Sequence, residues 1–135
     1  MKIRIIDYGV KILPTRAHPY DAGSDVYVPE ACVIPARSSI RIPLGFGVEI
    51  PAGHVGYVMS RSGLSSMGIS CETPPIDTGY TGQVHAVVTN HTNSDYRVHE
   101  GDRIGQLVVL PVILADYTLG DVEKRGDAGF GSTGK

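Results

Sequence analysis

The sequence is poor in the residues from which metal centres, disulfide frameworks and large aromatic cores are built. Its 135 residues include no tryptophan, two phenylalanines and two cysteines. Cys32 and Cys71 stand in no CxxC or Cys/His spacing, so neither a zinc site nor a disulfide framework is supported. We interpret both cysteines as small, buried or half-buried hydrophobic residues of a reducing compartment.

An excess of charge of one sign and a long apolar run are also lacking. Twelve Lys and Arg residues against fourteen Asp and Glu residues give a net charge of -2, which leaves no basic surplus for nucleic acid. No apolar run approaches the length of a membrane span, and the first apolar segment reaches Asp7 too early for a signal peptide. We therefore expect a cytoplasmic protein with no nucleic-acid or membrane partner.

Glycine, proline and short Val/Ile-rich segments are abundant, whereas helix-forming runs are scarce. Seventeen glycines and nine prolines separate these segments, which is typical of an all-β sandwich or barrel in a single domain. The expected strands lie within 1–8, 22–28, 32–34, 39–43, 46–50, 54–59, 83–90 and 103–110. A loop is expected over 11–20, and a short helix within Ser60–Gly68.

The stretch Pro74–Gly82 organises the chain. Thr78 and Gly79 predict a two-residue hairpin turn that makes Asp77 and Tyr80 cross-strand partners. A carboxylate can accept a proton from a positioned water, and an aromatic ring can pack against a sugar. Taken alone, the stretch favours a plain hairpin whose Asp caps the turn and whose Tyr half-covers the core.

Three other places carry polar groups suited to an anion. Arg61, Ser62 and Gly63 combine a guanidinium, a hydroxyl and an unshielded amide at the start of the predicted helix. Gln106 is a long amide in an apolar strand and needs a partner, either protein backbone or ligand. Asp25 stands at the beginning of a predicted strand, where a turn carboxylate is the default interpretation.

The tail 125–135 contains four glycines and is too flexible to form an element. It nevertheless carries a cation, an aromatic ring and hydroxyls, which are groups that close over phosphates and lie on planar bases. A frayed terminus is the alternative. The residues concerned are Arg125, Phe130, Gly131, Ser132 and Thr133.

Five stretches in order resemble the five motifs of the trimeric dUTP pyrophosphatase (dUTPase) family. They are 22–26, 61–63, 76–82, 101–107 and 125–134, the last ending in Gly-Phe-Gly-Ser-Thr-Gly. The resemblance implies a compact, jelly-roll-like β barrel over residues 1–124 and a flexible C-terminal arm over 125–135. It also implies a homotrimer whose active sites are shared between subunits.

The resemblance further implies a role for each of these residues. Asp77 corresponds to the carboxylate that activates water for attack on the α-phosphorus of dUTP, and Tyr80 to the ring beneath the deoxyribose. Asp25 corresponds to a carboxylate that contacts Mg2+ through metal-bound water. The substrate-binding positions are Arg61, Ser62, Gly63, Ile76, Tyr80, Gln106, Arg125, Phe130, Gly131, Ser132 and Thr133.

The chain departs from the family pattern at two positions. Relatives carry an Asn six residues before the catalytic Asp and a Gly three residues before it, where this chain has Cys71 and Pro74. A thiol is a poor substitute for an amide, so we expect either that backbone groups of the hairpin recognise uracil or that the alignment with the family motif is shifted here.

Three hypotheses for function remain. The first is Mg2+-assisted hydrolysis of dUTP to dUMP and pyrophosphate. The second is a dCTP deaminase-like enzyme of the same fold. The Tyr80 ring and the glycine-rich arm favour the pyrophosphatase over this deaminase. The third is a nucleotide-dependent binding protein that recruits a regulatory protein partner.

Overall fold

The structure is a computed structural model, and it describes residues 1–121. Ten strands and one short helix are present in this part of the chain. They are β1 (Ile5–Asp7), β2 (Ser24–Tyr27), β3 (Cys32–Ile34), β4 (Ser39–Pro43), β5 (Phe46–Val48), β6 (His54–Met59), α1 (Ser62–Ser66), β7 (Ile69–Cys71), β8 (His85–Asn90), β9 (Tyr96–Val98) and β10 (Arg103–Pro111). The predicted all-β class is confirmed.

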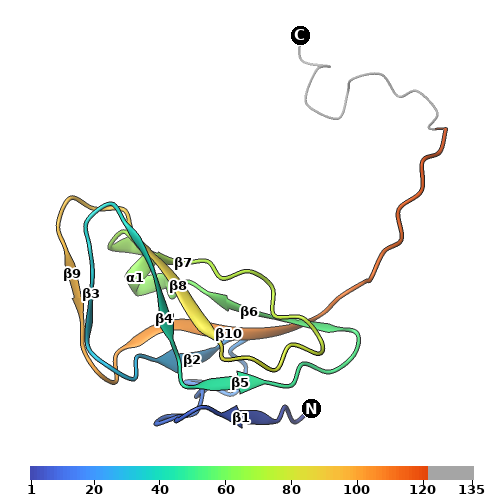
Figure 1. Ribbon diagram of the computed structural model, residues 1–135, viewed down its shortest axis with the longest axis horizontal. Helices are drawn as coiled ribbons and strands as arrows, with labels where there is room; N and C mark the ends of the chain where they lie inside the picture. The colour runs from blue at the N-terminus through green and yellow to red at the C-terminus, as the bar shows by residue number, and fades with distance from the viewer. Residues whose placement is uncertain (122–135) are drawn as a thin grey trace.

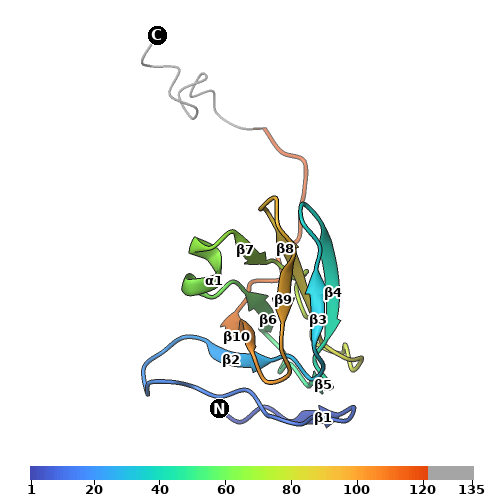
Figure 2. The ribbon, with the colours of Figure 1, turned by 90° about the vertical axis from the view of Figure 1, so that its left-hand side faces the viewer.

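The strands pair only in antiparallel fashion, in four small sheets with the orders β1-β5, β2-β10-β6, β3-β9 and β4-β8-β7. Within the described residues the pairings do not close a single barrel. Figure 1 shows β3 and β9 at one end of the body, and Figure 2 shows α1 and β7 on the side opposite β3 and β4. Most pairings join segments far apart in sequence, so each surface of the body is assembled from several stretches.

One apolar core holds these sheets together. Phe46, Ile34 and Ile104 are among its largest fully buried side chains. Strand β8 alternates between half-buried and buried positions along its whole length, as its sequence predicts for a strand with one face on the core. Asn90 is the polar residue on that inner face, and its amide donates to the carbonyls of Ile34 at 3.0 Å and Ser94 at 2.8 Å. The core therefore contains a buried amide whose hydrogen bonds are made.

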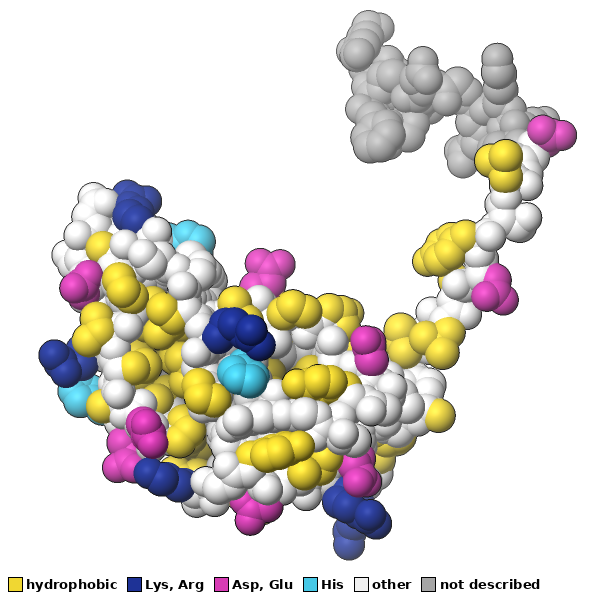
Figure 3. Space-filling view, viewed as in Figure 1, with side chains coloured by type: hydrophobic (Ala, Val, Ile, Leu, Met, Phe, Trp, Pro, Cys, Tyr) yellow, Lys and Arg dark blue, Asp and Glu magenta, His cyan; other side chains and the backbone are white. Residues whose placement is uncertain are grey.

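The chain leaves the body after β10 (Figure 1). The Val112 N–H still donates to the Gly53 carbonyl at 2.9 Å, but the extended chain that follows carries apolar side chains in the open (Figure 3). Ile113, Leu114 and Tyr117 are 90%, 83% and 93% exposed. No helix among the described residues is long and apolar enough to cross a membrane.

The structure corrects one of the predicted elements and confirms two others. The first strand is three residues long rather than eight, because Met1 to Arg4 and Tyr8 lie outside the β1-β5 ladder. The predicted loop over 11–20 is confirmed apart from one isolated bridge between Thr15 and Asp25. The short helix is also confirmed, as α1.

Candidate functional site

Ile76 leads the chain into a tight turn that ends at Tyr80. Ile76 is buried, and its N–H donates to the Gly56 carbonyl at 2.7 Å while the Gly56 N–H donates back at 3.0 Å. The Tyr80 N–H donates to the Asp77 carbonyl at 3.1 Å, and Gly79 has a φ of +91°. A positive φ at the third of four residues is that of a type II turn, and glycine adopts it without strain. The predicted turn is therefore confirmed.

The predicted strand pairing around this turn is wrong. Asp77 and Tyr80 belong to no strand, because β7 ends before them and β8 begins after them. Glu72 donates the last backbone hydrogen bond of the incoming chain to β8, at 3.0 Å. Pro74 and Pro75 come after Thr73 and have no N–H to continue the ladder with β8. The chain bridges β6 on both sides of these prolines, at Glu72 and at Ile76.

Asp77 and Tyr80 nevertheless line one cleft, with a volume of about 570 Å³. Asp77 is exposed, and Tyr80 is 47% exposed. The Tyr80 hydroxyl donates to the Gln83 carbonyl at 3.0 Å, which folds the phenol ring across the backbone of Gly82. A carboxylate and a ring therefore face the same cleft, which is the relation that the sequence predicts for a base and a sugar platform. The other residues lining this cleft are Arg41, Glu72, Thr73, Pro74, Pro75, Ile76, Gln83, Val84, His85 and Val87.

The two positions at which the chain departs from the family pattern, Cys71 and Pro74, lie in different surroundings. Cys71 is 5% exposed and belongs to the core, and burial raises the pKa of its thiol to about 11, so the thiol is protonated at neutral pH. Pro74 lines the cleft that contains Asp77. Next to it, the Thr73 hydroxyl donates to one carbonyl of β8 at 3.3 Å and accepts from one N–H of β8 at 3.2 Å. Thr73 thus ties the cleft wall to β8 where the backbone ladder stops.

Asp25 lies in a second cleft, of about 710 Å³, between two arginines. The Arg61 Nε donates to Asp25 Oδ1 at 3.1 Å, and the Arg103 Nη1 lies 3.7 Å from Asp25 Oδ2. The Asp25 side chain is 15% exposed, whereas those of Arg61 and Arg103 are 26% and 52% exposed. The carboxylate therefore holds both guanidinium groups at the cleft wall, and each retains donors for an anion.

A β-bulge in β10 places two polar side chains in this second cleft. Arg103 pairs with Tyr27 and Gly105 pairs with Val26, so two steps along β10 match one step along β2. Side chains three residues apart normally face opposite sides of a strand, but the extra residue brings Arg103 and Gln106 to the same side. The Gln106 amide donates to the Ser60 carbonyl at 2.8 Å, so its partner is protein backbone.

Helix α1 begins beside the same cleft. Arg61 is its N-cap residue, and no side chain caps the first turn. Ser62 lines the cleft together with Arg61, and Gly63 follows with open space where a side chain would stand. This start of α1 therefore presents a guanidinium, a hydroxyl and unshielded backbone, as predicted from the sequence.

The structure brings the predicted residues together as two groups. Ile76, Asp77 and Tyr80 form one group, and the second group consists of Asp25, Arg61, Ser62 and Gln106. The two clefts share no lining residue, although a groove of about 510 Å³ beside Met59 adjoins both. Arg125, Phe130, Gly131, Ser132 and Thr133 lie outside the described residues.

Sequence reasoning missed several residues that line the clefts. Arg103 belongs to a motif stretch, but the bulge that directs it beside Gln106 leaves no clear mark in the sequence. His18 and Asp21 line the second cleft, from a loop closed by a hydrogen bond from the His18 N–H to Asp21 Oδ2 at 3.0 Å. Their only signal is their position shortly before Asp25. Within the described residues, no three His, Cys, Asp or Glu side chains form a cluster that could hold a metal ion.

The β-rich body has two clefts, one with a carboxylate and a phenol ring and one lined by arginines. Together they offer the groups that bind a phosphorylated nucleoside. The family model for dUTPase matches residues 10–134, and the chain belongs to this family. It is 41% identical over 129 residues to the deoxyuridine 5'-triphosphate nucleotidohydrolase of Debaryomyces hansenii, with 91% of this chain and 81% of that protein covered.

Solved structures agree with this assignment. The dUTPase of Staphylococcus bacteriophage 80alpha with dUpNHpp has a TM-score of 0.85 at 28% identity, covering 97% of each chain. Phage dUTPases such as this one control the transfer of virulence genes. A variant dUTPase of Staphylococcus aureus phage phi11, which coordinates a structural Mg(II) ion, has a TM-score of 0.79 at 27% identity, covering 93% and 99% of the two chains.

Proposed function

We propose that this protein hydrolyses dUTP to dUMP and pyrophosphate. The proposal rests chiefly on one observation within a member of the dUTPase family: Asp77 and Tyr80 face a common cleft, as a base and a sugar platform must.

Asp77 is the general base. It takes a proton from a water whose oxygen bonds to the α-phosphorus, while the bond from that phosphorus to the oxygen leading to the β-phosphate breaks and pyrophosphate leaves. The exposure of Asp77 gives water access to its carboxylate. Tyr80 packs beneath the deoxyribose and leaves no room for a 2'-hydroxyl, and the buried Ile76 anchors the turn that carries both side chains.

Arg61, Ser62, Gly63 and Gln106 contact the phosphates. Hydrolysis of a triphosphate depends mainly on charge neutralisation and on a positioned nucleophile, and a guanidinium held by a carboxylate is preorganised for the first task. Arg103, which shares Asp25 with Arg61, adds a second cation to the same cleft.

The proposed cofactor is Mg2+. Asp25 is a single carboxylate already paired with two guanidinium groups, so the ion would be held mainly by the substrate phosphates. Asp25 would contact it through bound water. When present, the ion supplies neutralisation of the phosphate charge. The glycine-rich arm would close over the bound nucleotide, with Arg125, Gly131, Ser132 and Thr133 at the phosphates and Phe130 over uracil.

A homotrimer with shared active sites is supported by two observations. The two groups of predicted site residues line separate clefts of one chain, which is the arrangement expected where Arg61 of one copy and Asp77 of another act on one substrate. The segment after β10 exposes large apolar side chains, which a neighbouring subunit would cover. Each site would then combine the Asp77 cleft of one subunit with the Arg61 cleft of another.

Parallel assays of dUTP, dCTP, dTTP and UTP test the function directly. Pyrophosphate release from dUTP, at a kcat/KM at least roughly 100-fold above that for UTP, is expected, because the site excludes a 2'-hydroxyl. Ammonia release from dCTP would instead assign the deaminase-like activity and overturn the proposal. A regulatory protein partner and a cytoplasmic location stay predictions.

A further inference from the structure

We infer that Tyr8 is a positioning residue for the turn that carries Asp77 and Tyr80, and that its hydroxyl contributes to the discrimination between deoxyribose and ribose. The inference rests on the proposed function, since it concerns the same cleft. Tyr8 lies directly after β1, about seventy residues before the turn in sequence. Its hydroxyl donates to the Thr81 carbonyl at 2.5 Å.

The loop from Ile76 to Gln83 is tied to the body at both ends. At the entry, the Thr78 hydroxyl donates to the Pro51 carbonyl at 3.0 Å, next to the paired hydrogen bonds of Ile76. At the exit, the Gln83 Oε1 accepts from the Gly45 N–H at 2.8 Å. These ties leave the centre of the loop to be fixed by other contacts.

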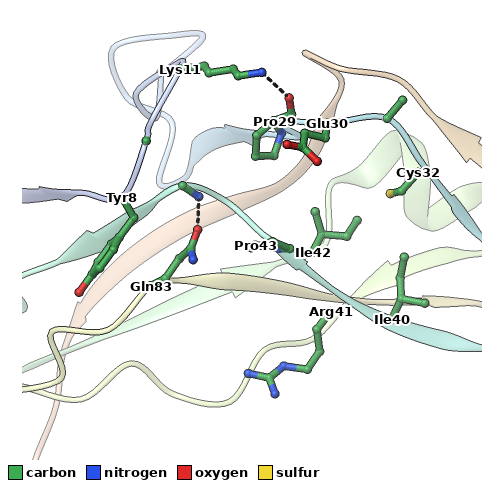
Figure 4. A pocket seen from close by; sticks show the side chains of 13 residues that line it. Tyr8, Lys11, Pro29, Glu30, Cys32, Ile40, Arg41, Ile42, Pro43 and Gln83 are labelled. Atoms are coloured by element: carbon green, nitrogen blue, oxygen red, sulfur yellow. Dashed lines mark hydrogen bonds between the residues drawn. The ribbon is translucent and has the colours of Figure 1, made fainter.

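Tyr8 supplies that contact. Among the described residues, its bond to Thr81 is the one hydrogen bond from outside the loop that reaches residues 80–82. Tyr8 and Gln83 lie near each other at one end of a cleft of about 310 Å³ (Figure 4). The ring also packs on Gly47 of β5, where a Cβ would stand 3.1 Å from the ring and 2.7 Å from the Gly82 carbonyl. Because glycine has no side chain, both the Tyr8 ring and the 76–83 loop can lie close to β5 at Gly47.

The backbone around Tyr8 is itself fixed. The N–H groups of Val10 and Gly9 donate to the Asp7 carboxylate at 2.9 and 2.8 Å, and the Tyr8 N–H donates to the Gly45 carbonyl at 2.9 Å. These contacts hold the residue on both sides, so its hydroxyl has a defined position relative to β5. A fixed donor bound to the Thr81 carbonyl restricts the adjacent Tyr80, whose ring has to meet the sugar.

Tyr8→Phe removes the hydroxyl and keeps the ring. The freed Thr81 carbonyl can bind water because the site is half exposed, with Tyr8 at 46%, so Tm should change by only a few degrees. The ratio of kcat/KM for dUTP over UTP is expected to fall roughly 2- to 10-fold, the effect of one neutral hydrogen bond on the placement of the Tyr80 ring. Tyr96→Phe in β9 is the matched control, and it should leave the ratio unchanged.

Hydrogen exchange of the Tyr80 amide provides a measurement that needs no catalysis. This amide is bonded to the Asp77 carbonyl within the turn, and Tyr8→Phe should speed its exchange whereas Tyr96→Phe should not. An unchanged selectivity ratio together with unchanged exchange would overturn the inference, as would equal effects of both variants. If the wild-type protein releases no pyrophosphate from dUTP, the proposed function fails, and the exchange comparison still decides whether Tyr8 positions the turn.

Discussion

Adding one methyl group at Gly82 should displace the Tyr80 ring and leave the fold in place. A Cβ at this position would stand 2.5 Å from the Tyr80 hydroxyl oxygen and 2.6 Å from the ring carbon that bears it. Carbon contacts need roughly 3.5–4 Å, so the ring must move by about 1 Å. Gly82 does not have a positive φ, so alanine itself causes no backbone strain there.

The expected consequences differ for stability and for activity. The ring is 47% exposed and can swing outward, so Gly82→Ala should lower the free energy of unfolding by about 1 kcal/mol, the value of the lost bond to the Gln83 carbonyl. A misplacement of about 1 Å beneath the sugar should lower kcat/KM for dUTP by roughly 10- to 100-fold.

Pyrophosphate release from dUTP and UTP, with urea unfolding in parallel, measures both effects. Gly120→Ala is the control for an added methyl group, because a Cβ there meets open space. Full activity of Gly82→Ala toward dUTP would refute the role of Tyr80 as the sugar platform.

Further predictions concern the base, the arm and the buried thiol. Asp77→Asn should lower kcat by roughly 100- to 10,000-fold while dUpNHpp binding is retained, and persistent turnover would refute its role as base. Deletion of the residues after Lys124 should leave a folded trimer with little activity; full turnover would contradict the role of the arm. Burial raises the Cys71 pKa from 9.0 to about 11, so the free energy of unfolding should be unaffected well below pH 9 and should fall between pH 9 and 11, because the unfolded chain ionises first. Urea unfolding of wild type and Cys71→Ala should therefore diverge in that range, and identical pH profiles would disprove the shift.

Local sequence signals predicted much of this fold. Alternation along β8 and the glycine at the third position of the 77–80 turn act within a few residues, and the structure contains both features. The hairpin pairing was predicted wrongly because the missing N–H groups of Pro74 and Pro75 outweighed the turn signal.

The candidate site could be predicted only in part. Sequence stretches identify Asp77, Tyr80, Arg61 and Gln106, but a bulge in β10 decides that Arg103 joins Gln106, and a bulge depends on the paired strand. The separation of these residues into two clefts likewise depends on how distant segments pack, so the local sequence does not reveal it.

Mixing two inactive variants tests most directly whether each active site combines clefts from two subunits. Asp77→Asn and Arg61→Ala, unfolded together and reassociated in equal amounts, should recover about a quarter of wild-type dUTP hydrolysis, because a random mixture supplies both intact clefts at about one site in four. Asp77→Asn mixed with Tyr80→Ala should recover none, since both changes lie in the same cleft of one chain. Activity of the first mixture no higher than that of its separate components would contradict the shared site.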